Sequence, residues 1–219
     1  MASLFERYRP QTWSEVVGQD KLVAKVNALR PRGLGGRAWW IAGPSGAGKT
    51  TCARILAREV AADHAITEMD ASELTPADVR AFQTQWRGRP LGSPGWALLL
   101  NEAHGLRRDT VRALLVMLED LPDYAVVIFT TTAEGQESLF DDQIDAHPLL
   151  SRCIELPLAR RGLAEAFAKR AHEIAEAEGL NGRPLADYAR LLKDCRNSMR
   201  AALQKIEAGW ALQGNDQAE

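Results

Sequence analysis

Continuous apolar runs recur along the first 157 residues, and polar or glycine-rich segments separate them. The clearest are AWWIA at 38–42, WALLL at 96–100 and AVVIFT at 125–130. Short apolar runs without alternation are typical of strands that are covered on both faces. A further run, AITEMD at 65–70, predicts a fourth short strand.

In the segments between these runs, the apolar residues are spaced as in helices. Apolar residues recur at intervals of three and four over 19–30, 53–60 and 108–119. Another helix is expected to begin at Pro76, because Thr75 is a good N-cap and Asp78 can close a capping box. Strands that alternate with helices in this way predict a parallel sheet, so residues 1–157 are expected to form an α/β domain.

The pattern changes after Pro157, where no further β-branched run occurs. Three helical patterns follow, with apolar positions that begin at Leu163, Leu185 and Met199. The expected fold class is therefore α/β with a parallel sheet, followed by a small all-helical domain at 158–213 and a disordered tail at 214–219.

The segment GPSGAGKT matches the pattern G-x-x-x-x-G-K-[ST] between a predicted strand and a predicted helix. Glycines allow successive backbone N–H groups to surround a β-phosphate, and a helix N-terminus adds positive potential. Lys49 is expected to reach the β- and γ-phosphates, and the Thr50 hydroxyl to bind Mg²⁺. The sequence thus predicts a nucleoside triphosphate site formed by Gly43, Pro44, Ser45, Gly46, Ala47, Gly48, Lys49, Thr50 and Thr51.

Asn101 and Glu102 follow the run WALLL, at the strand end where a P-loop ATPase needs an acid. Glu102 is predicted to polarise the attacking water, and the alternative is that it only forms a salt bridge with a neighbour. Asn101 stands where a carboxylate that holds Mg²⁺ is expected. Since an amide coordinates without a charge, weaker Mg²⁺ binding and slow hydrolysis are expected.

The amino-acid composition excludes several classes of protein. The chain has 219 residues, of which 46% are hydrophobic and 26% charged, which describes a globular protein. A net charge of −2 gives no overall positive field, so any contact with nucleic acid must be local. No run reaches a membrane span and the first ten residues are charged, which predicts an intracellular protein. Three cysteines without C-x-x-C, and four histidines without ligand spacing, exclude a disulfide framework and a zinc site.

Taken in order, these motifs resemble the AAA+ ATPases, and within them the clamp-loader subunits of bacteria, archaea and eukaryotes. RYRPQTWSEVVGQD is similar to the N-terminal box of that family, and LLLNEAHGLRRD to its Walker B segment. HPLLSRCIELPL matches its SRC motif, and NSMRAAL matches sensor 2. The likeness covers nearly the whole chain and implies a P-loop ATPase domain at 1–157, a helical lid at 158–213, and ATP and Mg²⁺ as cofactors.

The resemblance also implies roles for single residues. Thr132 corresponds to sensor 1, and Arg200 to the arginine that contacts the γ-phosphate of its own subunit. Arg152 corresponds to the arginine that reaches the ATP of an adjacent subunit, so hydrolysis would depend on assembly. The adenine pocket is implied to consist of Tyr8, Arg9, Pro10, Val16 and Val17.

The implied partners are other AAA+ subunits in a homo- or hetero-oligomer, a sliding clamp and primer–template DNA, without a membrane. Arg80, Arg107 and Arg108 match the positions at which the family contacts the DNA backbone. Backbone contacts of this kind are independent of sequence and sensitive to salt. The expected location is the cytoplasm of a bacterium or of a phage-infected cell.

Two departures from the family leave alternatives open. The zinc insertion of many bacterial relatives is absent, and no segment after Trp210 corresponds to the helical collar, so assembly through ATPase modules alone or a minimal version is expected. The leading hypothesis is an ATPase that loads a sliding clamp on DNA. The alternatives are a weakly hydrolysing assembly subunit, another AAA+ remodeller or helicase loader, and a small P-loop kinase, which leaves the SRC motif unexplained.

Overall fold

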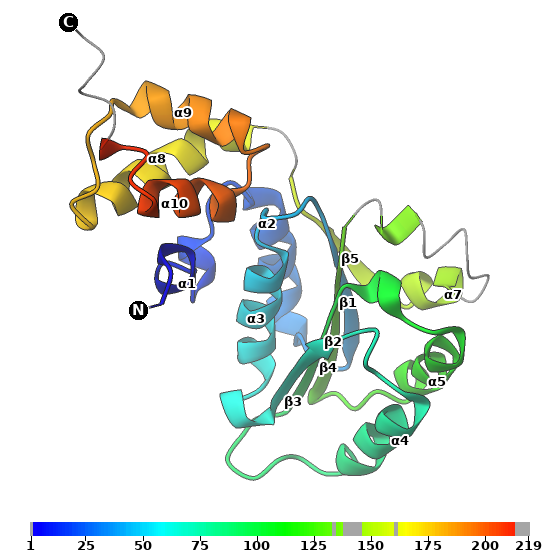
Figure 1. Ribbon diagram of the computed structural model, residues 1–219. Coiled ribbons are helices and arrows are strands. Elements are labelled where there is room, and N and C mark those ends of the chain that lie inside the picture. Colours follow the sequence, from blue (N-terminus) through cyan, green and yellow to red (C-terminus); the bar gives the residue numbers. More distant parts are fainter. Residues whose placement is uncertain (1, 133–134, 138–145, 160–161, 213–219) are drawn as a thin grey trace, which may run out of the picture. The chain divides into compact units, whose positions relative to one another are not determined.

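A computed structural model describes residues 2–132, 135–137, 146–159 and 162–212 (Figure 1). Its contacts divide the chain into two compact units. The sheet unit consists of Lys21–Gly43 and Lys49–Leu158. The helical unit consists of Met1–Asp20, Pro44–Gly48 and Ala159–Glu219.

Five parallel strands form the centre of the sheet unit, in the order β2-β3-β4-β1-β5. They are β1 (Arg37–Ala42), β2 (Ile66–Asp70), β3 (Trp96–Asn101), β4 (Ala125–Thr131) and β5 (Cys153–Pro157). The three long apolar runs form the three central strands, β1, β3 and β4. Every residue of these strands is buried except the first and last residues of β1 and β3. The parallel sheet and the four strands expected from the sequence are confirmed.

The fifth strand was not predicted. β5 lies at the edge of the sheet and, among the described strands, pairs with β1 alone, from Ala38 opposite Cys153 to Ala42 opposite Pro157. Of its five residues only Leu156 is buried. An edge strand with one solvated side has no need of a continuous apolar run, so its sequence carries little strand signal.

Helices cover both faces of the sheet (Figure 1). One face carries α2 (Asp20–Leu29) and α3 (Lys49–Val60), and the other carries α4 (Pro76–Gln85), α5 (Arg108–Glu119) and α7 (Ala146–Ser151). The predicted capping box at Thr75 and Asp78 is present and begins α4. Short 3₁₀ turns occur at η1 (Trp13–Glu15), η2 (Arg30–Arg32), η3 (Asp63–Ala65) and η4 (Ala103–Gly105).

Large apolar side chains fill the space between the sheet and α4 and α5. Trp40 on β1 and Phe129 on β4 are register partners, and their ring centroids lie 5.4 Å apart. Leu98 and Leu100 from β3 and Leu114 from α5 complete this cluster and are fully buried. Each such side chain stabilises the fold by about 1.5–3 kcal/mol, so the strand ends that carry the polar motifs are firmly held.

The helical unit contains α1 (Leu4–Arg7), α8 (Leu163–Ala177), α9 (Leu185–Asp194) and α10 (Met199–Glu207). Its core joins Leu4 of the N-terminal arm to Phe167, Tyr188 and Leu203. The arm, which the sequence analysis assigns to the ATPase domain, thus packs with the later helices, and the boundary expected after residue 157 stays a prediction. The tail expected at 214–219 lies outside the described residues. No helix in the described ranges is long and apolar enough to cross a membrane.

The cysteines are unpaired thiols in apolar surroundings. Burial raises the pKa of both Cys52 and Cys153 to about 12. A thiol with so high a pKa is protonated at neutral pH and is a poor nucleophile. This agrees with a packing role for these residues.

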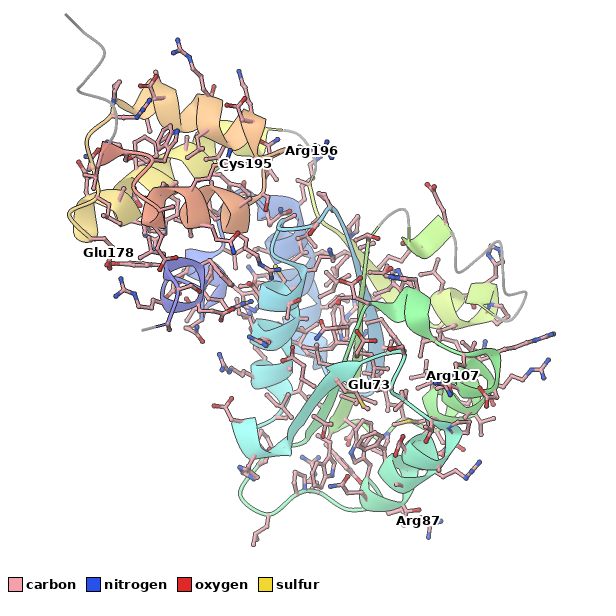
Figure 2. All side chains as sticks on the ribbon, in the orientation of Figure 1. Glu73, Arg87, Arg107, Glu178, Cys195 and Arg196 are labelled. Atoms are coloured by element: carbon pink, nitrogen blue, oxygen red, sulfur yellow. The ribbon has the colours of Figure 1, made fainter. Side chains whose placement is uncertain are left out.

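Tyr8 ties the N-terminal arm to the residue that follows α8. Its hydroxyl donates to Glu178 Oε1 at 2.6 Å, and Arg7 forms an ion pair with the same carboxylate; Glu178 is labelled in Figure 2. These two contacts, the Tyr8 hydrogen bond first, hold the pKa of Glu178 below its ordinary value. A carboxylate whose pKa is lowered by folding contributes stability above its unfolded pKa, and this contribution is lost as the pH falls through the folded value.

We therefore expect Tyr8→Phe to lower the melting temperature at neutral pH, and to do so less at a pH acidic enough to protonate Glu178 in the folded protein. Thermal melts followed by circular dichroism at the two pH values measure this difference. Tyr124→Phe is the matched control, because the Tyr124 hydroxyl donates to the neutral carbonyl of Trp86 at 2.9 Å. An equal shift for Tyr8→Phe at both pH values would contradict the assignment.

Candidate nucleotide site

The phosphate-binding segment runs from the end of β1 to the start of α3, as the sequence predicts. Gly46 and Gly48 have φ values of 76° and 101°, in the left-handed region that favours glycine. Among the residues that the structure describes, none lies within 4 Å of a Cβ added to Gly48, so open space lies beside this part of the backbone. Because α3 begins at Lys49, its unpaired N–H groups lie at the end of the same segment. Glycine backbone, open space and a helix N-terminus together fit a phosphate chain.

Lys49 is only 8% exposed. Its ammonium donates to the Gly43 carbonyl, with an Nζ–O distance of 3.2 Å, so the side chain spans the segment from its last residues to its first. A buried ammonium is costly unless polar groups or an anion surround it. Phosphate oxygens would be stronger, charged acceptors for the same group.

Thr50 and Asn101, the two predicted Mg²⁺ ligands, lie side by side in the sheet unit. The Thr50 hydroxyl donates to Asn101 Oδ1 at 3.4 Å, and the Thr130 hydroxyl donates to the same oxygen at 3.0 Å. Asn101 Nδ2 donates to Glu68 Oε1 at 2.8 Å. Glu68 was not predicted from the sequence. A charged residue in the middle of the short strand β2, which pairs with β3, is the signal that could have found it.

These two side chains fit a magnesium ion chemically. Hydroxyl and amide oxygens are hard donors of the kind that Mg²⁺ accepts. In the part of the chain that the structure describes, no group of three or more His, Cys, Asp or Glu side chains could hold a metal. Because neither Thr50 nor Asn101 carries a charge, an ion that they held would have its charge balanced mainly by nucleotide phosphates.

Glu102 directly follows β3 and has a left-handed backbone, with φ 52° and ψ 55°. This conformation is uncommon for a residue other than glycine, and such strain is frequent at functional sites. The side chain is 46% exposed, and its Oε2 lies 3.5 Å from His104 Nδ1. The carboxylate therefore lies at the strand end where the sequence predicts it, and it also has the ion-pair neighbour that the alternative interpretation requires.

Thr132 directly follows β4. Its hydroxyl oxygen accepts a hydrogen bond from the Gly135 N–H at 3.0 Å. The preceding residue, Thr131, is the register partner of Ala42, and its carbonyl accepts from the Gly43 N–H at 3.2 Å. Parallel strands place their carboxyl ends at one edge, so the structure brings the predicted sensor close to the start of the phosphate-binding segment.

Arg152 lies between α7 and β5, and its side chain is 37% exposed. Its guanidinium forms an ion pair with Glu119 at the end of α5, with an Nη2–Oε1 distance of 2.8 Å, and Nη1 donates to the Pro148 carbonyl at 3.1 Å. Exposed ion pairs contribute about 0–1 kcal/mol, so this one can be exchanged for a stronger anion at little cost.

Arg200 is the second residue of α10 in the helical unit, and it is exposed. Its Cζ lies 5.3 Å from the centroid of the Phe5 ring. Ser198 caps α10 by accepting from the Ala201 N–H at 3.3 Å. A Cβ added to Gly46 would lie 2.0 Å from Ser198 Oγ, and both residues belong to the helical unit. The helix start that carries Arg200 thus lies next to Gly46 within the helical unit.

The five residues of the predicted adenine pocket all lie in the helical unit. Tyr8 and Val17 pack against its apolar core, and Arg9 forms an ion pair with Glu6. Pro10 and Val16 are half-buried. The N-terminal arm is thus packed on the helices of this unit.

The three arginines predicted to contact DNA are all exposed and lie on two helices that pack together. Arg80 is in the middle of α4, Arg107 is the N-cap of α5, and Arg108 is the first residue of α5; Arg107 is labelled in Figure 2. Their exposure leaves them accessible to a polyanion.

Comparison with known proteins shows to which family the chain belongs. The family model described as "ATPase family associated with various cellular activities (AAA)" matches residues 40–156, which is just over half of the chain. The chain belongs to the AAA family of ATPases. This AAA ATPase is 30% identical over 155 residues to the DNA polymerase III subunit gamma/tau of Mycobacterium tuberculosis, a match of 59% of this chain and 27% of that protein. It is 27% identical over 235 residues to the tau/gamma subunit of Haemophilus influenzae, a match of 95% of this chain and 32% of that protein.

The AAA ATPase therefore spans about a third or less of the length of these two relatives. Among solved structures, it is similar to the Thermotoga maritima RuvB Holliday junction branch migration motor, with 23% identity and a TM-score of 0.71 over 91% of this chain and 64% of that one. This likeness supports the fold alone. The resemblance to clamp-loader-type AAA+ ATPases and the expected fold class are both confirmed.

Proposed function

We propose that this AAA ATPase is a clamp-loader subunit that binds ATP with Mg²⁺ and hydrolyses it at subunit interfaces, in order to load a sliding clamp on DNA in the bacterial or phage-infected cytoplasm. The observation that carries the proposal is the match to DNA polymerase III gamma/tau subunits, which covers 95% of the chain for the tau/gamma subunit of Haemophilus influenzae. The arrangement of Lys49, Thr50 and Asn101 at the sheet edge supports the ATP site.

Within one subunit, the backbone of Gly43–Gly48 and the N-terminus of α3 bind the phosphates, and Lys49 exchanges its Gly43 acceptor for phosphate oxygens. Thr50 and Asn101 would hold Mg²⁺, which would supply positive charge next to the phosphates. Glu102 orients and polarises the attacking water, and Thr132 and Arg200 contact the γ-phosphate. The base is held by Tyr8, Arg9, Pro10, Val16 and Val17, and Ser45, Ala47 and Thr51 complete the nucleotide site.

Between subunits, Arg152 leaves Glu119 and neutralises charge on the γ-phosphate of its neighbour. Because the arginine is exposed and its ion pair is weak, docking a neighbour needs no local unfolding. Hydrolysis therefore occurs only in an assembly, whether its members are copies of this chain or other AAA+ subunits.

A second candidate function is that of an ATP-binding assembly subunit that scarcely hydrolyses. Asn101 favours it, because a neutral amide holds Mg²⁺ more weakly than a carboxylate does. Mg²⁺-dependent phosphate release separates the two candidates. The clamp-loader proposal predicts release above that of a Lys49→Ala control in the presence of primed DNA and partner subunits, and an equal rate for both proteins would exclude the ATPase.

The affinity for DNA is expected to fall with rising salt concentration, because the three exposed arginines contact phosphates. Replacing Arg80, Arg107 and Arg108 together by alanine should reduce the slope of log affinity against log salt by about three, roughly one for each lost phosphate contact. Fluorescence anisotropy with labelled primer–template DNA measures the slope. Arg190→Ala is the control, since Arg190 is exposed on α9, far along the sequence from these helices. An unchanged slope in the triple variant would remove these residues from the DNA site.

A further inference from the structure

The side-chain amide of Asn101 is held by three neighbours in the sheet unit. Its Nδ2 donates to Glu68 Oε1 at 2.8 Å, while its Oδ1 accepts from Thr130 at 3.0 Å and from Thr50 at 3.4 Å. An amide presents an acceptor on one side and donors on the other, and the two sides have nearly the same size. Which side faces Thr50 therefore depends on the partners.

Of these three partners, Glu68 alone can decide the orientation. The hydroxyls of Thr50 and Thr130 can donate or accept, so they tolerate either side of the amide. An ionised carboxylate only accepts, so Glu68 requires the N–H side of Asn101. Arg54 reinforces that role, because its guanidinium donates to both carboxylate oxygens of Glu68, at 2.7 Å from Nε to Oε2 and 3.0 Å from Nη2 to Oε1.

We propose that Glu68 is a positioning residue for the metal that accompanies the nucleotide: it fixes Asn101 so that the amide oxygen faces Thr50. This rests on the proposed function, since the metal arrives with ATP. In the opposite orientation the amide would direct its N–H groups at the cation, which repels them. Residues that orient a metal ligand commonly change metal affinity by about 10–100-fold when they are removed.

The role of Glu68 depends on the amide at position 101. Aspartate has two equivalent acceptor oxygens, so either orientation presents an oxygen to Thr50. In an Asn101→Asp background, Glu68 therefore has no amide to orient. In that background the Glu68 carboxylate instead becomes a like charge next to the new one. Glu68→Gln is therefore harmful only when Asn101 is present, and this separates orientation of the amide from a general effect on the fold.

The experiment measures Mn²⁺ binding to the full chain with ADP, by electron paramagnetic resonance of the free ion. It compares four proteins: the wild type, Glu68→Gln, Asn101→Asp and the double variant. Glu68→Gln is expected to weaken Mn²⁺ binding about tenfold in the wild-type background. The same substitution is expected to change it less than about twofold in the Asn101→Asp background. Binding of ADP in EDTA, measured by calorimetry, should be the same for the wild type and Glu68→Gln.

An equal loss of Mn²⁺ affinity in both backgrounds, or no loss in either, would overturn the positioning role. Reduced ADP binding in EDTA for Glu68→Gln would also overturn it, because the substitution would then act on the nucleotide site as a whole. If the wild type itself binds no ADP, it is the proposed ATP site that fails. The two failures are thus distinguishable.

Discussion

Arg152→Ala is expected to lower ATP hydrolysis in the assembled protein by about a thousandfold, the lower end of what an arginine supplied across an interface contributes. ATP binding by the same variant should stay within about twofold of the wild type, because the nucleotide is bound by the other subunit's phosphate-binding segment. The fold should be retained, since the variant loses only an exposed ion pair with Glu119.

Phosphate release and binding of a fluorescent ATP analogue measure the two quantities separately. Arg58→Ala is a matched control, because Arg58 also forms an exposed ion pair in the sheet unit, with Asp63 at 2.9 Å. A variant that hydrolyses ATP at the wild-type rate would remove Arg152 from the catalytic machinery.

Glu102→Gln is expected to slow hydrolysis by about 10²–10⁴-fold, the usual contribution of a group that accepts or orients a proton in the transition state. Glutamine keeps the size of the side chain at this left-handed position, so the backbone after β3 should not change. Affinity for ATP should be unaltered, and complexes that need bound ATP should last longer because the nucleotide persists.

Glu73→Gln is the control for this variant, since Glu73 is an exposed carboxylate in the same unit and is labelled in Figure 2. Single-turnover phosphate release with excess protein measures the chemical step. A rate equal to that of the control would mean that Glu102 only pairs with His104, as the alternative interpretation holds.

The sequence predicted those parts of the fold that are specified locally. The three central strands are continuous apolar runs, and the phosphate-binding segment needs glycine where φ is positive, as at Gly46 and Gly48. The capping box at Thr75 likewise lies within four residues. In each case the physical cause and its signal share one short segment.

Contacts between distant segments were not predictable in the same way. Glu68 and Asn101 are 33 residues apart, as are Glu119 and Arg152, and only the folded sheet brings each pair together. The edge strand β5 has too few buried residues to produce a strand pattern. The packing of Leu4 and Tyr8 with the later helices follows from tertiary contacts that no local pattern encodes.

The central claim is that one subunit binds the triphosphate while a neighbour supplies Arg152. Mixing two inactive variants, Arg152→Ala and Glu102→Gln, tests it most directly, because each retains what the other lacks. If interfaces form at random, the account predicts that the mixture recovers roughly a quarter of the wild-type rate of phosphate release. A mixture no more active than the sum of its two components would contradict it.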